Sequence, residues 1–153
     1  MPIRFATEQD VPALVALGKR MHAITRFKSF VYDEARVAQA LSAAFTGGKN
    51  RYVCMVAVNN QGEVVGGLLA VMEQHIFSSQ LTASIMHYDV LPEARMAGWG
   101  VRLLRAFELW AKNRQVMEIS FGINSGDAQG IVARFAGKMG FEEVGKNFVK
   151  GLQ

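Results

Sequence analysis

An arginine and two glycines stand where an apolar run gives way to a helical pattern. Arg95, Gly98 and Gly100 lie between the apolar residues 81–91 and the amphipathic residues 101–112. Glycine lets the backbone approach a ligand closely and adopt dihedral angles that other residues resist. A helix that begins there points its unpaired N–H groups and the positive end of its dipole to the same place. This spacing predicts a binding site for a diphosphate.

Two familiar phosphate-binding patterns do not fit these residues. A Rossmann fingerprint needs a third glycine, but Leu103 occupies the matching position. A Walker loop needs Gly-Lys followed by Ser or Thr, and the sequence does not contain that triplet. The remaining pattern is Arg-x-x-Gly-x-Gly after a strand.

The composition predicts a compact domain spanning residues 1–153, with 50% hydrophobic and 20% charged residues. No apolar run reaches the roughly 18 to 20 residues of a membrane-spanning helix, and residues 1–5 do not resemble a secretory signal. Cys54 is the only cysteine, so no internal disulfide can form, and it is expected to be an inert core residue. We therefore expect a cytoplasmic protein without a membrane partner.

The net charge of +4 suits an anionic ligand, but the basic residues are scattered. Nucleic-acid-binding proteins tend to show dense basic tracts interleaved with aromatics, so a nucleic-acid partner is disfavoured. The spacing of the histidines offers no metal motif, and no metal cofactor is expected.

Hydrophobic periodicity predicts a mixed α/β fold. Strands are expected at residues 3–7, 52–58, 63–72, 81–91 and 117–123, and two short strands at 141–144 and 148–152 close the chain. Helices are expected after residue 10, from about Asp33 to Gly47-Gly48, over 101–112, and before Gly140. Gly140 is expected to form a left-handed cap, with Phe141 after it as the apolar partner. The order β-α-α-β-β-β-α-β-α-β implies a central mixed, mostly antiparallel sheet with helices on both faces.

Local signals refine this outline. Thr7 and Asp10 have the spacing of a helix start. Residues 59–62 have turn chemistry and predict an antiparallel hairpin. Gly66 and Gly67, inside the strand that follows, indicate a bulge or a close backbone approach.

With these elements in this order, the chain resembles the GCN5-related N-acetyltransferase (GNAT) superfamily. The resemblance covers nearly the whole chain in element order. It is specific in residues 90–100, Val-Leu-Pro-Glu-Ala-Arg-Met-Ala-Gly-Trp-Gly, and in residues 134–141, Arg-Phe-Ala-Gly-Lys-Met-Gly-Phe. Residues 3–10 are also similar to the family's first strand and helix start.

The resemblance implies that acetyl-coenzyme A (acetyl-CoA) binds as a cosubstrate. Backbone N–H groups of residues 95–101 would hold its diphosphate, and the main chain of residues 88–90 would pair with the pantetheine arm. That strand is expected to diverge from residues 117–123, with the thioester in the gap. The implied cofactor-binding residues are Asp89, Val90, Arg95, Met96, Ala97, Gly98, Trp99, Gly100, Val101 and Gln129. Met96 stands where the family often has glycine, and methionine is tolerable there if its φ is negative. The Trp99 ring either covers the adenine or packs against the sheet, and packing is favoured.

The implied reaction is direct attack of a primary amine on the thioester in a ternary complex. An amine with a pKa of about 10.4 is neutral at pH 7 in only about 0.04% of molecules, a penalty of about 4.6 kcal/mol. Protonating a thiolate whose thiol has a pKa of about 8.5 gains only about 2 kcal/mol at pH 7. A general base or a desolvating pocket therefore matters more than a general acid.

His87 is the leading candidate base because histidine titrates near neutrality, and the alternative is a hydrogen-bonded strand histidine without a catalytic role. Asp89, Glu73 and His75 are the other candidates. Strand alternation puts His87 and Asp89 on one face and Tyr88 on the other, and a bulge could reverse which face meets the site.

The tyrosine that acts as general acid in the family would follow Phe135, but Ala136 occupies that position. Tyr88 and Tyr32 are candidate replacements. The alternative function is therefore a non-catalytic acyl-CoA-binding regulatory module.

The acceptor is expected to be a small-molecule amine or a protein amine, and a homodimer is the commonest association for such a chain. The aromatic residues Phe27, Phe30 and Tyr32 either wall the acceptor pocket or close the core.

Overall fold

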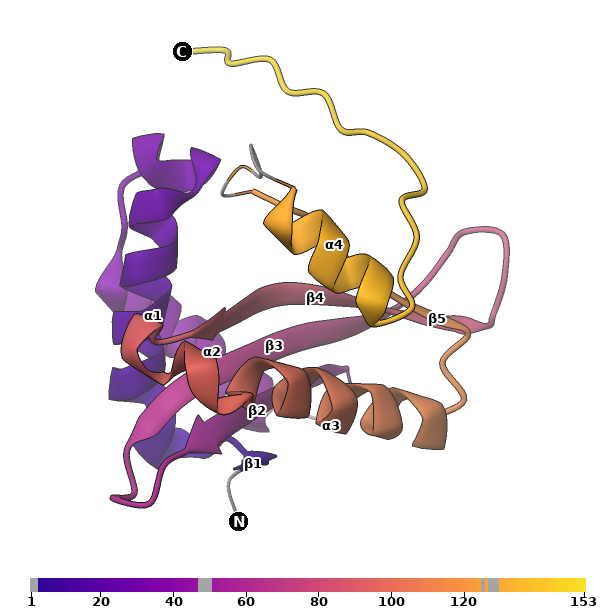
Figure 1. Cartoon of the computed structure of the whole chain (residues 1–153). Helices are drawn as coiled ribbons and strands as arrows, with labels where there is room; N and C mark the ends of the chain where they lie inside the picture. Colours follow the sequence, from indigo (N-terminus) through magenta and orange to yellow (C-terminus); the bar gives the residue numbers. More distant parts are fainter. Residues whose placement is uncertain (1–2, 47–50, 125, 127–129) are drawn as a thin grey trace.

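A computed structural model describes residues 3–46, 51–124, 126 and 130–153. Within them, one five-stranded sheet has the order β1-β2-β3-β4-β5 (Figure 1). The strands are β1 (Ile3–Phe5), β2 (Tyr52–Val58), β3 (Val64–Gln74), β4 (Leu81–Val90) and β5 (Glu118–Phe121). The first four strands pair antiparallel, whereas β5 runs parallel to β4. This confirms the predicted mixed, mostly antiparallel sheet.

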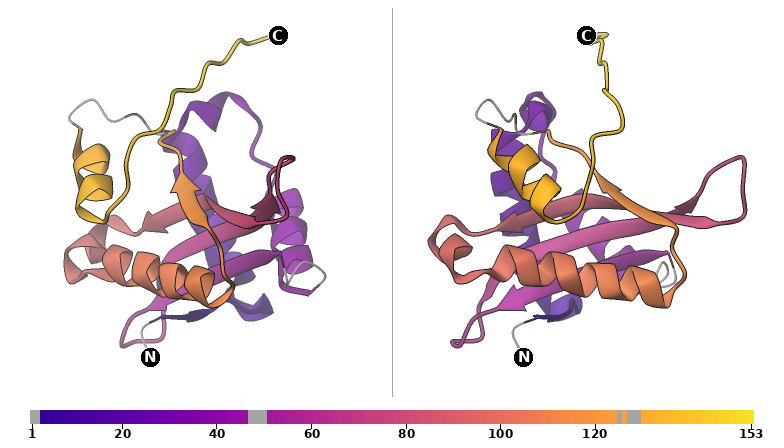
Figure 2. Two further views of the ribbon diagram at one scale, coloured as in Figure 1. Left: turned by 90° about the vertical axis from the view of Figure 1, so that its right-hand side faces the viewer. Right: turned by 45° about the vertical axis from the view of Figure 1, so that its right-hand side comes forward.

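Helices cover both faces of the sheet (Figure 2). They are α1 (Val11–Ile24), α2 (Glu34–Thr46), α3 (Trp99–Asn113) and α4 (Ile131–Lys138), with short 3-10 helices η1 (Glu8–Asp10), η2 (Arg26–Ser29) and η3 (Pro92–Ala97). Residues of α1 and α2 pack on one face, and residues of α3 and α4 pack on the other. The predicted end of α2 at Gly47 and Gly48 lies outside the described residues.

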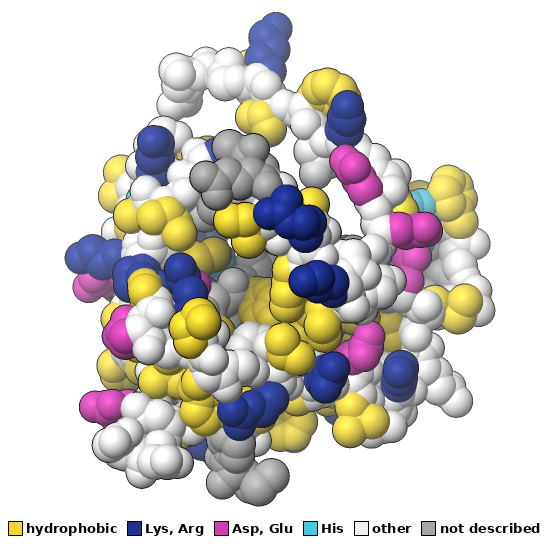
Figure 3. All heavy atoms as spheres, in the orientation of Figure 1, with side chains coloured by type: hydrophobic (Ala, Val, Ile, Leu, Met, Phe, Trp, Pro, Cys, Tyr) yellow, Lys and Arg dark blue, Asp and Glu magenta, His cyan; other side chains and the backbone are white. Residues whose placement is uncertain are grey.

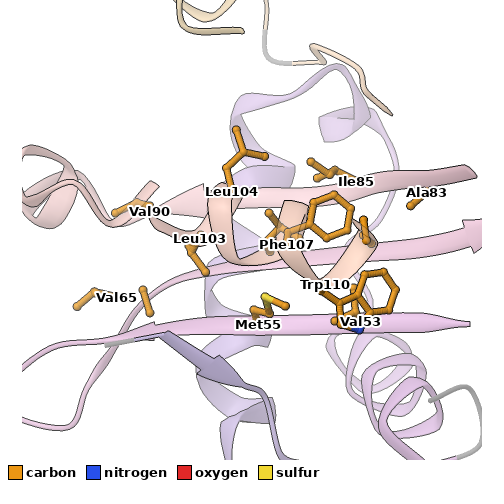
Figure 4. Packing of buried hydrophobic residues seen from close by; sticks show 14 residues of the cluster. Val53, Met55, Val65, Ala83, Ile85, Val90, Leu103, Leu104, Phe107 and Trp110 are labelled. Carbon is orange, nitrogen blue, oxygen red and sulfur yellow. The ribbon is translucent and has the colours of Figure 1, made fainter. Parts of the chain in front are cut away.

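The apolar stripe of α3 forms the larger core (Figure 4). Leu103, Leu104 and Phe107 are almost fully buried against side chains from β2, β3 and β4. Burial of such a side chain contributes about 1.5–3 kcal/mol to folding. This packing fixes the start of α3 at the end of β4.

Strand β2 is covered on both faces, as its continuous apolar run predicts. Val53 and Met55 belong to the core under α3, whereas Cys54 and Val56 belong to the core under α1 and α2. Burial raises the pKa of the Cys54 thiol to about 12, so it stays protonated. Cys54 is thus an inert core residue, as expected.

Close approach explains the glycine pair of β3. A Cβ added at Gly66 would lie 3.0 Å from the Asp89 carbonyl oxygen, and one added at Gly67 would lie 3.0 Å from Cδ2 of Leu14. These contacts confirm the predicted close approach. The glycines bring β3 tightly against both β4 and α1.

The first helical segment begins with a capping box, as its sequence predicts. Asp10 is buried and accepts two hydrogen bonds from the Arg4 guanidinium, at 2.8 and 3.0 Å. It also accepts one from the Thr7 backbone N–H at 2.8 Å. The Arg4 hydrogen bonds, more than any other cause, lower the pKa of Asp10.

The last part of the chain differs from the prediction. Gly140, with a φ of 89°, follows α4 in the left-handed conformation. The Phe141 ring packs edge-on against the Phe121 ring, with 5.0 Å between the two ring centroids. The cap is therefore confirmed. The two strands predicted at 141–144 and 148–152 are wrong, because no strand follows α4 in the described part of the chain.

These residues have the apolar spacing of a strand but, among the described residues, no neighbouring strand to pair with. Beyond Phe141 the chain extends away from the sheet (Figure 1), and Val144, Phe148 and Leu152 are 87, 93 and 89% exposed. Apolar residues at strand-like spacing form a strand only when a neighbouring edge satisfies their backbone groups. This segment does not reach such an edge.

Replacing Asp10 with Ala should lower the free energy of unfolding by about 2 kcal/mol, since Arg4 and Thr7 both lose their acceptor. Urea unfolding followed by circular dichroism measures this difference. Because the folded pKa of Asp10 is lowered, its contribution is complete above its ordinary value of 3.8. The difference between the two proteins should shrink only as the pH falls below that value, and a difference already lost at pH 6 would contradict this role.

Candidate active site

Strand β4 contains a bulge and then separates from its neighbour. Leu69 of β3 pairs with His87, but the next residue, Ala70, pairs with Ile85, so Met86 is the extra residue. Pairing between β4 and β5 ends at Ile85 and Phe121. Beyond this point the chain that follows β5 turns away from β4 (Figure 2), as predicted. The outer edge of β4 after Ile85 therefore has no partner strand among the described residues.

The bulge decides which side chains face the α1 side of the sheet. Ile85 and Tyr88 belong to the core under α3, whereas Leu69, the partner of His87, packs with the core under α1 and α2. His87 and Asp89 consequently face α1. In a regular strand without a bulge at Met86, alternation would put His87 on the same face as Ile85.

A cavity of about 520 Å³ lies between α1, α2 and the sheet and extends to the gap between β4 and β5. Its volume falls within the range of about 300–1,000 Å³ that small-molecule sites occupy. Leu17, Met21, Phe27, Tyr32 and Leu41 are among its apolar lining residues. Figure 3 shows the hollow, with hydrophobic, Lys and Arg side chains around it.

His87 lines this cavity. Its side chain has surface exposed to the cavity, but many protein atoms surround the imidazole and reduce its contact with bulk water. This desolvation lowers the pKa of His87 from its ordinary value of 6.5. At neutral pH the imidazole is therefore uncharged and can accept a proton.

Asp89 holds two arginines from different elements. Its carboxylate lies 2.8 Å from Nη2 of Arg20 in α1 and 3.4 Å from Nη2 of Arg95 in η3. Arg95 also donates from Nε to the Val90 carbonyl oxygen at 3.0 Å. Asp89 is thereby engaged by its neighbours, and together these groups tie α1 to the segment that precedes α3.

The residues that open α3 leave backbone donors at the surface. Gly98 adopts a φ of 79°, and α3 starts at Trp99. The first hydrogen bond of the helix runs from the Arg102 N–H to the Gly98 carbonyl oxygen at 3.2 Å, and no side chain caps this helix. The N–H groups of Trp99, Gly100 and Val101 precede that bond, so the helix itself offers them no acceptor.

The space in front of these donors is open. A Cβ at Gly98 would meet no atom within 4 Å, and Met96 is 98% exposed. Met96 does not have a positive φ, because Gln115 is the only described non-glycine residue that does. The Trp99 ring packs against the core under α3, as predicted, and the Arg102 guanidinium lies 4.3 Å above it.

Tyr88 connects the end of β4 to the start of α3. Its hydroxyl donates a hydrogen bond to the Gly100 carbonyl oxygen. A Cβ at position 100 would lie 3.3 Å from that hydroxyl, which explains why glycine suits this position. Burial raises the pKa of Tyr88 to about 12, so its hydroxyl keeps its proton.

The structure does not bring all the sequence candidates together. Glu73 lies near the β3–β4 turn and His75 within it, and neither lines the cavity. Phe27 and Tyr32 line it, whereas Phe30 does not. Gln129 lies outside the described residues.

Sequence reasoning missed two residues of the site. His22 lines the cavity, and its Nε2 donates to the Phe30 carbonyl oxygen at 2.6 Å. Arg20 pairs with Asp89. On a helix, Arg20 and His22 flank the apolar stripe of α1 that packs on the sheet. This position does not identify the residues that they contact.

Among the described residues, no group of three or more His, Cys, Asp or Glu side chains could hold a metal ion. Within the same part of the chain, no helix has the length and apolar character that crossing a membrane requires.

Comparison with known proteins identifies related sequences and folds. The acetyltransferase (GNAT) family matches residues 20–141. The sequence has no significant match among curated proteins.

Several solved structures are similar in fold. A tetramutant of a Bacillus halodurans protein is 21% identical, with 99% of this chain and 100% of that chain covered and a TM-score of 0.81. A probable acetyltransferase is 15% identical, with 100% and 99% covered and a TM-score of 0.79. An aminoglycoside acetyltransferase from an uncultured soil metagenomic sample, in complex with sisomicin, is 21% identical, with 99% and 95% covered and a TM-score of 0.74.

Replacing Asp89 with Asn should lower the free energy of unfolding by about 1–2 kcal/mol, because Arg20 and Arg95 lose their charged partner. Urea unfolding at pH 7 measures the change. Glu34→Gln is the control, since it removes an ion pair with Lys19 in which both side chains are exposed and should cost less than about 0.5 kcal/mol. Equal effects of the two substitutions would contradict a stabilising role for Asp89.

Proposed function

Since the chain belongs to the acetyltransferase (GNAT) family, which transfers acyl groups from acyl-CoA, we propose that it transfers the acetyl group of acetyl-CoA to a primary amine. One observation carries this proposal. The cavity that His87 lines extends to the gap between β4 and β5, and the uncapped start of α3 follows the end of β4. An acyl donor and an amine can therefore approach the same point from two sides.

The backbone of residues 95–101 would bind the diphosphate of acetyl-CoA. The open space at Gly98 and the N–H groups that start α3 fit an anion. The Arg95 side chain is committed to Val90 and Asp89, so its proposed role is to hold this segment in place. The pantetheine arm would lie along the main chain of Asp89 and Val90, on the edge of β4 that β5 does not cover. The Val90 carbonyl oxygen already accepts a hydrogen bond from Arg95, so the arm would have to use other main-chain groups of this edge.

His87 is the proposed base. The amine nitrogen attacks the carbonyl carbon of the thioester, and the proton it loses passes to the neutral imidazole, directly or through a water molecule. The carbon–sulfur bond then breaks and coenzyme A leaves as a thiolate. The lowered pKa of His87 keeps the imidazole ready to accept a proton at neutral pH.

Tyr88 is the candidate proton donor to the thiolate. Its hydroxyl is protonated, but it donates to the Gly100 carbonyl oxygen, and that hydrogen bond would have to exchange. Tyr32 is already committed, since its hydroxyl donates to the Val15 carbonyl oxygen at 2.7 Å. Because protonation of the thiolate gains only about 2 kcal/mol, the reaction depends less on an acid than on a base.

Ala136 supports a second candidate function, an acyl-CoA-binding module without catalysis, because the tyrosine of the family is replaced there. A thiol assay for coenzyme A release with a panel of amines separates the two. Release above the rate of thioester hydrolysis supports the transferase, and tight binding without release supports the module.

A carboxylate at position 98 should repel the diphosphate. Gly98→Glu is expected to weaken acetyl-CoA binding at least about tenfold more than Gly98→Gln, which carries the same backbone strain at a positive φ without the charge. Isothermal titration calorimetry measures both affinities. Equal affinities of the two variants would place the diphosphate elsewhere.

His87→Ala should lower kcat/KM by about 10²–10⁴ and remove the acid limb of its pH profile. In the unchanged protein this limb should lie below pH 6.5, since burial lowers the pKa of His87 and activity is lost as the imidazole becomes protonated. His22→Ala, the other histidine of the cavity, is the control and should retain the limb. A limb that survives in His87→Ala would assign His87 a structural role.

A further inference from the structure

Among its described residues, the cavity wall offers no free carboxylate. Most of its described lining residues are aliphatic or aromatic, and Asp89 is the only acidic side chain among them. Both oxygens of Asp89 are engaged, one by Arg20 at 2.8 Å and the other by Arg95 at 3.4 Å. A cationic group that enters the cavity therefore finds no unpaired counter-ion among these residues.

Three polar side chains of the wall are also committed to protein partners. The Tyr32 hydroxyl donates to the Val15 carbonyl oxygen at 2.7 Å, and the Thr25 hydroxyl donates to the His22 carbonyl oxygen at 3.3 Å. Nε2 of His22 donates to the Phe30 carbonyl oxygen at 2.6 Å. The His87 imidazole, by contrast, makes no hydrogen bond within the described part of the chain, and it remains available to a single amine.

Positive charge lies beside the wall. The Arg26 backbone N–H donates to the Asn124 carbonyl oxygen at 2.9 Å, and Nε of Arg26 donates to Oδ1 of Asn124 at 3.2 Å. The Arg26 guanidinium lies 4.3 Å above the ring of Phe27. Because Asn124 and Phe27 both line the cavity, this fixed cation disfavours a ligand that carries several positive charges.

We propose that the acceptor is an apolar monoamine, an alkyl or arylalkyl amine without a second cationic group, and this inference rests on the proposed function. The hydrocarbon body gains free energy by leaving water for the aliphatic and aromatic wall. A second ammonium would lose its hydration without gaining a counter-ion. The amine at the other end of the ligand faces His87.

The same wall assists the chemistry. An ammonium in an apolar environment has a lowered pKa, because burial disfavours its charged form. A monoamine in this cavity would therefore release its proton more readily than it does in water. His87, uncharged at neutral pH, can accept that proton.

A matched pair of ligands tests the proposal. Hexylamine and 1,6-diaminohexane have the same chain length and differ by one ammonium group. We expect kcat/KM for hexylamine, measured by coenzyme A release at pH 7.5, to exceed that for the diamine by at least about 100-fold. Calorimetric binding of both amines to the coenzyme A-loaded protein should show the same preference.

A charge placed in the wall should change this preference. Met21 lies in α1 and lines the cavity. Met21→Glu should reduce the preference for hexylamine at least about tenfold, whereas the uncharged Met21→Gln should leave it within about twofold.

The outcomes separate this inference from the proposed function. Acetylation of both amines at equal rates, or a preference for the diamine, overturns the monoamine assignment and leaves acetyl transfer intact. Absence of coenzyme A release with every amine overturns acetyl transfer. In that case the calorimetric comparison still decides the ligand class, because tighter binding of the diamine overturns the assignment and tighter binding of hexylamine supports it.

Discussion

The candidate site depends on one irregularity in the sheet, the bulge of β4 at Met86, where pairing with β5 also stops. The extra residue turns His87 and Asp89 toward α1, and the loss of pairing after Ile85 opens the gap beside them. A regular β4 would direct His87 at the α3 core. Bulges commonly redirect side chains next to binding sites, and this one has the same effect here.

Close packing joins the two sides of the site. Gly66 and Gly67 allow β3 to approach β4 and α1, and Gly100 allows the Tyr88 hydroxyl to reach the backbone of α3. Asp89 adds a polar connection between α1 and η3 through two arginines. The proposed diphosphate segment and the acceptor cavity are thus parts of one packed unit.

Signals carried by neighbouring residues predicted structure well, and signals that depend on distant partners did not. The capping box at Asp10 and the left-handed cap at Gly140 follow from local backbone hydrogen bonding, so the sequence alone was sufficient. The position of the bulge depends on the register between β3 and β4, which no single strand determines. Arg20 and His22 were missed for the same reason, since their partners lie elsewhere in the chain. The strands predicted after residue 140 failed because an apolar pattern does not provide a pairing edge.

The apolar wall of the cavity is compatible with Ala136 at the position where the family has a tyrosine. At neutral pH, deprotonating the amine costs more than twice what protonating the thiolate gains, by the reference pKa values of the two groups. A cavity whose described lining has no free carboxylate would lower the pKa of a bound ammonium, and the proposed base, an uncharged His87, would receive its proton. Loss of the general acid affects only the protonation of the thiolate, which is the smaller of the two free energies. The described residues around the cavity therefore suit the larger of these two proton-transfer costs, and for the proposed reaction the absence of the tyrosine does not argue against catalysis.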